Sequence, residues 1–356
     1  MLMKYTIYYI TTFLAVLLSA CTTSDDAGNM PQTLNMRVND FVEVKTRASN
    51  DVQNDAFQTD ENINIWVWDA GVLGTSTATY SYSYELQTNI QHKVVNVDVS
   101  KTLVPKDLVA FKFPLSGVNE EKVNIRACYP VQEQYESVTE INMQTLRNTP
   151  ATFTIQTDQS TEAGYKASDL MYGLPTAGNP VKNNNSLVGM TFNHKMAKVI
   201  IEITAGQGID DLTGIDVELS CVLNAAVRTE APNYDMVVEP TTGNEKVSGT
   251  VKVNTADMVS GQTVATMAAV IPPQEFPHDQ TFITITRGNV TYIYAPTSDI
   301  SFLSCSKNTF YITIEEYRLI VSGTITPWNA DGDEKVLTGT IYEVIAREEE
   351  TPQSNP

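Results

Sequence analysis

The chain is built from many short runs of β-branched and aromatic residues, with Pro, Gly or Asn close by to interrupt them. Runs of this length and composition form β-strands, and their short, regular spacing is typical of β-sandwiches. The sequence therefore predicts an all-β fold with a hairpin turn at residues 287–289, and residues 138–146 are the best candidate for a short helix. The clearest runs are 64–68, 94–99, 123–129, 151–155, 199–204, 215–219, 250–253, 281–285, 291–294 and 310–314.

Length and composition set the number of domains. The chain has 356 residues, of which 42% are hydrophobic, so it can bury more than one small core. Two apolar runs, 123–129 and 263–271, each stop at proline, which hints at two related domains. A boundary between residues 205 and 206 is predicted, because Gly206 and Gly208 follow a strong apolar strand and precede a polar turn.

The charge balance excludes one class of partner. The formal net charge is −19, and a surface this acidic repels a phosphate backbone. Nucleic-acid binding is therefore not expected, and the acidity suits a secreted protein.

The N-terminus resembles the signal peptide of a bacterial lipoprotein. A single basic residue, Lys4, precedes an uncharged apolar run at 7–18, which is shorter than the ~20 residues of a membrane-spanning helix. The run ends in Leu-Ser-Ala-Cys, a lipobox pattern in which Cys21 becomes the acylated first residue of the mature chain. This predicts a signal peptide at 1–20 and a lipid-anchored precursor on the outer membrane; an ordinary signal peptide followed by a chance cysteine is the alternative.

Three further cysteines, Cys128, Cys221 and Cys305, are widely spaced and offer no CxxC pair for a metal or for redox chemistry. Their odd number argues against a disulfide framework, although a single bond stays open in an oxidising compartment. Because Cys128 and Cys221 lie inside apolar runs, we expect them to be small buried hydrophobes.

The segment that follows the predicted lipid site combines a strand with a basic site. Apolar residues alternate at 34–38, continue at 42–44, and are followed by Lys45 and Arg47. An arginine in an accessible polar segment is a natural target for a trypsin-like protease. The simpler interpretation is that Arg47 is a solvated loop charge.

Catalytic and metal-binding patterns are not found. The three histidines, His92, His194 and His278, have no ligand spacing, and we expect His194 to be a hydrogen-bonded structural residue. Residues 329–334 alternate oxygen ligands as calcium loops do, but their glycine is misplaced for an EF-hand, so an Asx-rich turn is favoured. The sequence predicts neither a resident metal nor a cofactor, and a secreted hydrolase is the least supported function.

Alternating tyrosines mark residues 80–84. Tyr80, Tyr82 and Tyr84 share one face of a predicted strand and could stack on sugars. The same spacing describes an ordinary amphipathic strand, which is favoured. A monomeric surface lipoprotein that binds glycans or host proteins is therefore the alternative function.

Several segments, taken in order, resemble the fimbrillin family, the type V pilus subunits. The segment at 190–203 is similar to the signature of that family, and 168–173, 271–274, 310–314 and 325–329 agree with it. Each motif is little more than a strand and a turn, so order and spacing carry the resemblance. It implies two tandem transthyretin-like antiparallel β-sandwich domains and no enzymatic activity.

The resemblance also implies an assembly route by β-strand exchange. An Arg-specific protease would cut between Arg47 and Ala48 and so remove a propeptide, residues 21–47, together with its plug strand. The mature domains would be 48–205 and 206–356, joined to other subunits in an adhesive surface fimbrium with host or bacterial receptors. The plug residues would be Leu34, Met36, Val38, Val42 and Val44.

The strand that enters the vacated groove would come from the C-terminal segment of another subunit. Residues 336–345 are strand-like, and Leu337, Ile341 and Ile345 would fill the groove. The alternative is that this segment pairs within its own subunit as the last strand of its own domain. The polar tail at 346–356 departs from a chain that ends on its donor strand, and a tip subunit need not donate at all.

Overall fold

The computed structural model describes residues 34–38, 61–69, 90–97, 100–105, 113, 122–131, 150–184, 187–230, 235–240, 248–253, 261–316, 318–327, 335–337 and 347–348. Strands dominate, so the predicted all-β fold is confirmed. Every predicted run listed above lies in or overlaps a strand. The predicted turn is also present, because Arg287 and Val290 pair across Gly288, whose φ of 59° suits a residue without Cβ. The helix candidate at 138–146 lies outside the described residues.

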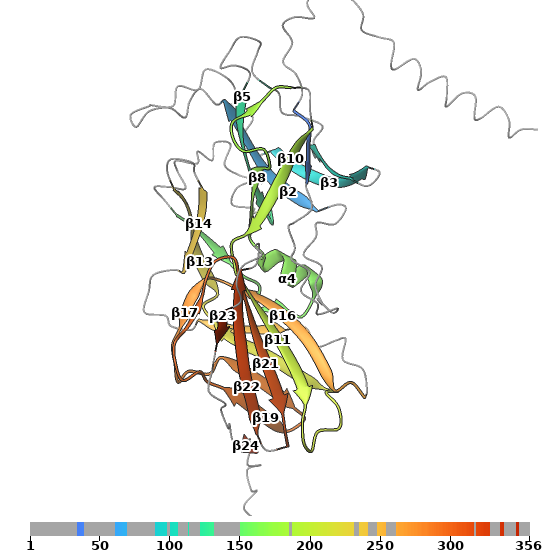
Figure 1. Cartoon of the computed structure of the whole chain (residues 1–356), viewed down its shortest axis with the longest axis vertical. Coiled ribbons are helices and arrows are strands. Elements are labelled where there is room, and N and C mark those ends of the chain that lie inside the picture. The colour runs from blue at the N-terminus through green and yellow to red at the C-terminus, as the bar shows by residue number, and fades with distance from the viewer. Residues whose placement is uncertain are drawn as a thin grey trace, which may run out of the picture.

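An eight-stranded sheet, here called the N-terminal sheet, forms the upper part of the molecule (Figure 1). Its order is β2-β3-β4-β1-β10-β8-β5-β9, and β2 also pairs with β5. Its core contains Ile63, Ile125 and Phe192, all buried. The strands are β1 (Met36–Val38), β2 (Asn62–Asp69), β3 (Ile90–Val97), β4 (Ser100–Pro105), β5 (Lys122–Tyr129), β8 (Met171–Pro175), β9 (Val181–Lys182) and β10 (Val188–His194).

A five-stranded and a six-stranded sheet form the lower part, here called the C-terminal sandwich. Along strands such as β12, buried side chains alternate with exposed ones. The buried side chains of the two sheets meet in one large hydrophobic core. The five-stranded sheet runs β16 (Val264–Ile271), β11 (Ala197–Ala205), β21 (Ser306–Ile314), β22 (Leu319–Pro327), β23 (Lys335–Leu337). The six-stranded sheet runs β24 (Arg347–Glu348), β19 (Val290–Tyr294), β18 (Ile283–Arg287), β12 (Ile215–Cys221), β15 (Gly249–Val253), β7 (Asp158–Gln159).

Two small sheets and one helix complete the structure. The helix α4 (Glu162–Ser168) lies between the upper and lower parts in Figure 1. Thr161 caps it, because its side-chain oxygen accepts a hydrogen bond from the Gly164 N–H at 3.1 Å. The small sheets contain β14 (Asp235–Pro240), β13 (Asn224–Glu230) and β6 (Ala151–Thr154), and β17 (Gln274–Phe276) with β20 (Ile300–Phe302).

The chain passes between the two parts more than once. After β5 it enters the lower part through β6, β7 and α4, returns for β8 to β10, and leaves again at β11. Strand pairing changes from one part to the other between His194 and Ala197, whereas β11, which ends at Ala205, pairs with β16 and β21 of the sandwich. The domain division after residue 205 and the transthyretin-like topology stay predictions.

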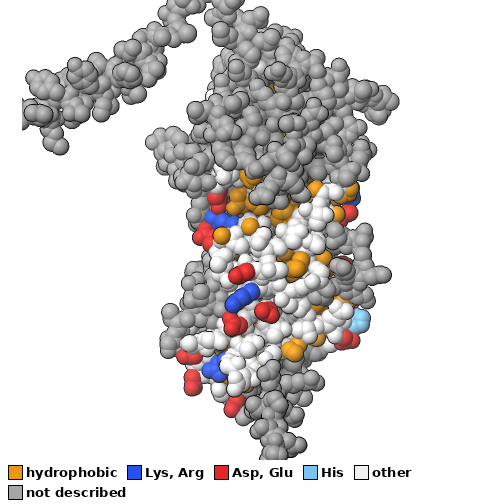
Figure 2. All heavy atoms as spheres, turned by 180° about the vertical axis from the view of Figure 1, so that it is seen from behind, with side chains coloured by type: hydrophobic (Ala, Val, Ile, Leu, Met, Phe, Trp, Pro, Cys, Tyr) orange, Lys and Arg blue, Asp and Glu red, His pale blue; other side chains and the backbone are white. Residues whose placement is uncertain are grey.

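Charged side chains are mixed on the face seen from behind (Figure 2). Lys252 lies 3.9 Å from Asp216, Nζ to Oδ1, and the guanidinium of Arg228 contacts Glu230 and Glu239 at 2.7 Å each. These two cations therefore each stand beside at least one carboxylate, as expected for a chain of net charge −19.

Candidate functional site

The short strand β1 lies between two longer strands of the N-terminal sheet. Met36 faces Val188 of β10, with which β1 runs parallel, and Leu103 of β4, with which it runs antiparallel. The Val188 N–H also donates to the Asn35 carbonyl oxygen at 2.9 Å. A three-residue strand is therefore paired on both sides, as an internal strand is.

The side chains of this segment alternate between core and solvent. Leu34 and Met36 are 3% and 1% exposed, while Asn35 and Arg37 face solvent. Leu34 and Met36 belong to one hydrophobic cluster with Leu103, Val188 and Met190. Burial of two such side chains contributes about 3–6 kcal/mol, since each is worth about 1.5–3 kcal/mol. The alternation read from the sequence is therefore present at residues 34–37.

Strand pairing closes the N-terminal sheet into a ring. Pairs run from β2 through β3, β4, β1, β10, β8 and β5 and return to β2. Among the described residues, β1 is the only strand that joins β4 to β10. Without β1, both strands would present unpaired backbone N–H and C=O groups beside an apolar floor.

The C-terminal segment lies on the edges of the sandwich. Leu337 of β23 faces Gly323 of β22, and Glu348 of β24 faces Val290 of β19. Each of these strands has one neighbour in its sheet. Leu337 is thus placed at an edge in this structure, whereas Ile341 and Ile345 lie outside the described residues.

Other predicted positions also lie outside the described residues. They are the lipidation site Cys21, the cleavage site Arg47 and Ala48, the plug residues Val42 and Val44, the tyrosines at 80–84 and the oxygen-rich loop at 329–334. For the plug residue Val38 the structure gives the backbone pairing in β1, opposite Met190 and Lys101. Among the residues it describes, no group of three His, Cys, Asp or Glu side chains could hold a metal ion.

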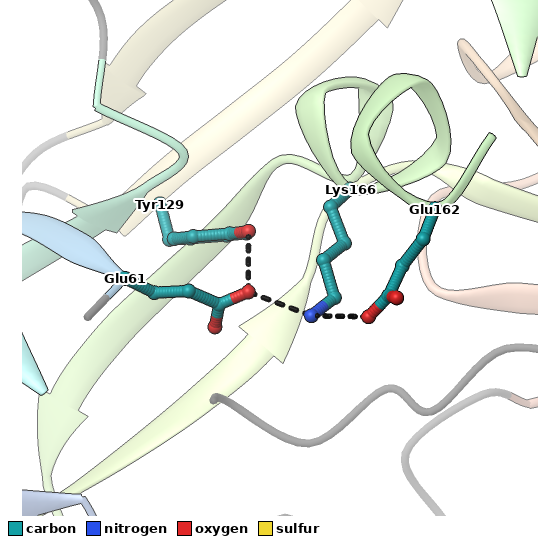
Figure 3. A network of polar contacts seen from close by, with 4 residues as sticks. All are labelled: Glu61, Tyr129, Glu162 and Lys166. Atoms are coloured by element: carbon teal, nitrogen blue, oxygen red, sulfur yellow. Dashed lines mark hydrogen bonds and ion pairs between the residues drawn. The ribbon is translucent and has the colours of Figure 1, made fainter. Parts of the chain in front are cut away.

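Sequence reasoning missed a polar network where the upper and lower parts meet (Figure 3). Lys166 of α4 extends its ammonium to Glu61, which precedes β2, at 2.7 Å, and to Glu162 at 2.9 Å. The Tyr129 hydroxyl donates to the same Glu61 oxygen at 3.3 Å. Burial alone would lower the pKa of Lys166, but its hydrogen bonds to the two carboxylates raise it. Burial, then the charge of Glu61, raises the pKa of Tyr129.

A second polar contact at this junction was partly predicted. His194 Nδ1 lies 2.8 Å from Asp169 Oδ1, and both side chains are almost fully buried. The structural role predicted for His194 is confirmed. Lys195 follows it, with its ammonium 5.6 Å from the centre of the Tyr172 ring, and burial lowers the pKa of Lys195.

Three cysteines lie in the part of the chain that the structure describes, and no disulfide joins any two of them. Cys128 and Cys221 are buried as predicted, and burial raises the pKa of each to about 12. Cys305 is half-buried. Burial keeps the first two thiols protonated and inert at neutral pH.

The model of the fimbrillin-like family matches residues 46–328. The chain belongs to this fimbrillin-like family. The family is one of fimbrial structural proteins and not of enzymes, which confirms the resemblance and indicates a fimbrial subunit at the cell surface. Both strand segments that the resemblance assigns to exchange, 34–44 and 336–345, fall outside the matched range.

Two solved structures of candidate cell adhesion proteins share the fold of this chain. A candidate cell adhesion protein from Bacteroides ovatus has a TM-score of 0.57 at 18% identity, covering 85% of this chain and 99% of that one. A second, from Bacteroides uniformis, has a TM-score of 0.54 at 16% identity, covering 86% and 100%. The tip fimbrial protein Mfa3 from Porphyromonas gingivalis covers 84% and 100% at 11% identity and a TM-score of 0.45. No curated protein matches the sequence.

Within the described part of the fimbrillin-like chain, no helix is both long enough and apolar enough to cross a membrane.

Proposed function

We propose that this fimbrial subunit polymerises by donor-strand exchange. The segment that carries Leu34, Met36, Val38, Val42 and Val44 is the plug that leaves the N-terminal sheet. A strand from the C-terminal segment of another subunit takes its place. Adhesion to host or bacterial surfaces is then a property of the assembled fimbrium.

The position of β1 is the observation that carries this proposal. Its loss would open the ring between β4 and β10 and uncover a groove lined by Leu103, Val188 and Met190. An incoming strand can pair with both open edges and place alternate apolar side chains in the groove. This groove between β4 and β10, called the slot below, therefore fits one β-strand.

The predicted cut is well placed to release β1. Arg47 and Ala48 lie after β1 ends at Val38 and before β2 begins at Asn62. A cut there leaves β1 attached to the rest only by noncovalent contacts. The family match begins at residue 46, beside this site. An Arg-specific protease is the partner that fits.

The donor assignment is supported by the place of the C-terminal segment. β23 holds only three residues and pairs on one side, so its departure costs little pairing. Leu337, Ile341 and Ile345 are the groove fillers of this proposal. A lipid on Cys21 would hold the precursor at the outer membrane until the cut after Arg47 discards lipid and plug together.

The test begins with mature surface material. N-terminal sequencing should start at Ala48, and Arg47→Ala should leave a full-length precursor and no fibres, while Lys45→Ala serves as the matched control and is processed normally. Fibres of normal length from the Arg47→Ala strain would contradict the proposal. A mature chain that keeps Cys21 would instead favour a monomeric surface lipoprotein.

The donor segment has its own test. A chain truncated before Val336 should still be processed but should form no ladder of polymers on denaturing gels. An undiminished ladder would assign the donor strand to another part of the chain.

A further inference from the structure

The proposed exchange requires that one wall of the slot stays in place when β1 leaves. That wall is β4, which β1 contacts at Leu103. β4 is the outer half of a hairpin with β3, and their pairing runs from His92 with Pro105 to Val97 with Ser100. The position of β3 therefore fixes the position of the wall.

The hairpin is fastened to the rest of the sheet by a short contact. β3 pairs with β2 only from Asn62 with Lys93 to Ile65 with Ile90. The part of the hairpin that borders β1 lies past this contact, toward the Val97 end. With β1 gone, the start of β2 carries the whole wall.

The residue just before that start is held from the lower part of the molecule. Glu61 directly precedes Asn62, and Lys166 binds it from α4 at 2.7 Å. The two side chains are 16% and 18% exposed, so water screens this pair less than it screens an exposed one. Tyr129, at the end of the neighbouring strand β5, donates to the same carboxylate. Figure 3 shows the Tyr129 hydroxyl and the Lys166 ammonium at the same oxygen of Glu61.

We infer that Lys166 is a positioning residue for strand exchange: through Glu61 it fixes the start of β2, and so keeps the β3–β4 wall of the slot in register while β1 leaves and another strand enters. This inference rests on the proposed function. It assigns a role in assembly to a side chain whose ion-pair partners in the described part of the chain, Glu61 and Glu162, lie outside both exchanged segments.

The experiment uses the full chain, cut after Arg47, with the plug segment still bound. The plug carries a label at the new C-terminus that the cut creates at Arg47. The rate of plug release is measured against an excess of unlabelled peptide of sequence 34–44. Lys166→Met and Glu61→Gln should each speed release about fivefold, the size expected for a partly buried ion pair. The double variant should release no faster than either single variant, because both remove the same contact.

Two control variants separate positioning from general destabilisation. Glu162→Gln removes the other partner of Lys166, which lies on the same helix, and should leave the release rate unchanged. Met267→Ala weakens the core of the sandwich and should also leave the release rate unchanged, because Met267 lies in β16 and in a different hydrophobic cluster from Leu103 and Met36. Equal release from wild type, Lys166→Met and Glu61→Gln would overturn the inference, as would faster release from the Glu162→Gln control.

A second measurement covers the case in which a cut variant does not stay folded. In the uncut chain, amide hydrogen exchange of β3 and β4 should be faster in Glu61→Gln than in wild type, and unchanged in Glu162→Gln. Unchanged exchange in Glu61→Gln would also overturn the inference. Failure of the proposed function looks different: a peptide of sequence 336–345 would not replace the plug even in wild type, whatever the variants do.

Discussion

The N-terminal sheet and the C-terminal sandwich close their hydrophobic cores in different ways. Of the buried hydrophobic residues that the structure describes, fifteen form the cluster of the N-terminal sheet. Forty-three form a second cluster that fills the sandwich and also takes in Trp66, Cys128 and Tyr172 from the N-terminal sheet. Leu34 and Met36 supply two of the fifteen from a segment that the predicted cut would separate from the sheet. The described parts of the C-terminal segment, β23 and β24, in contrast lie at the edges of the sandwich sheets. The smaller core thus depends on a removable strand, and the larger one does not.

Removal of residues 21–47 should have the largest effect and should act on one core only. The N-terminal sheet should lose about 3–6 kcal/mol from Leu34 and Met36 alone, while the sandwich keeps its stability. Circular dichroism during urea unfolding follows both parts together, and amide hydrogen exchange of β2, β5 and β8 against that of β12 and β18 separates the sheet from the sandwich. A parallel loss in both parts would show that the two cores unfold as one unit.

Loss of the buried Asp169 carboxylate, between the two cores, should destabilise the N-terminal sheet and the sandwich together. Asp169→Ala leaves His194 buried without its partner and should cost about 3–5 kcal/mol. Because the pair lies between the two cores, both unfolding transitions should shift. A matched variant, Asp299→Ala, removes a carboxylate from the exposed His278 and should shift neither by more than about 0.5 kcal/mol.

The same methionine-to-alanine substitution, made once in each core, should show that the two cores unfold separately. Met36→Ala and Met267→Ala each remove a fully buried methionine and should each cost about 2–5 kcal/mol. The first should shift only the unfolding of the N-terminal sheet, and the second only that of the sandwich. Arg37→Ala, next to Met36 but exposed, is the control, and differential scanning calorimetry gives both transitions.

The smallest effect comes from two buried thiols of the larger cluster, Cys128 on β5 of the N-terminal sheet and Cys221 on β12 of the sandwich. Because burial raises the pKa of Cys128 and Cys221 from 9.0 to about 12, the unfolded chain ionises first as the pH rises. The stability of each part should be intact below pH 9 and should fall between pH 9 and 12, by about 1 kcal/mol per thiol at pH 10. Cys128→Ala and Cys221→Ala should each remove the share of this pH dependence that comes from its own thiol; a pH profile that neither variant changes would contradict the assignment.

Local sequence predicted the strands well, because a β-branched or aromatic run such as 199–204 specifies an extended, half-buried backbone by itself. It could not predict partners. Nothing in residues 34–38 indicates that Met36 pairs with both Leu103 and Val188, since that pairing depends on segments far along the chain.

The helix α4 and the network around Lys166 were missed for related reasons. Seven residues are too few for helical periodicity to stand out, and only the cap Thr161 and the first-turn Glu162 carry a signal. Lys166 and Glu61 meet through the fold, although Lys166 and Glu162 are spaced as a helical ion pair would be. The predicted cleavage and lipidation sites at Arg47 and Cys21 stay predictions.

The repeated passage of the chain between its two parts has a mechanical consequence. Three segments of backbone connect them, after β5, between α4 and β8, and between β10 and β11. A pull along the long axis of the molecule is therefore shared by three covalent connections in parallel instead of running through a single linker. Each connection carries only part of the tension, so the two parts are built to stay together under load.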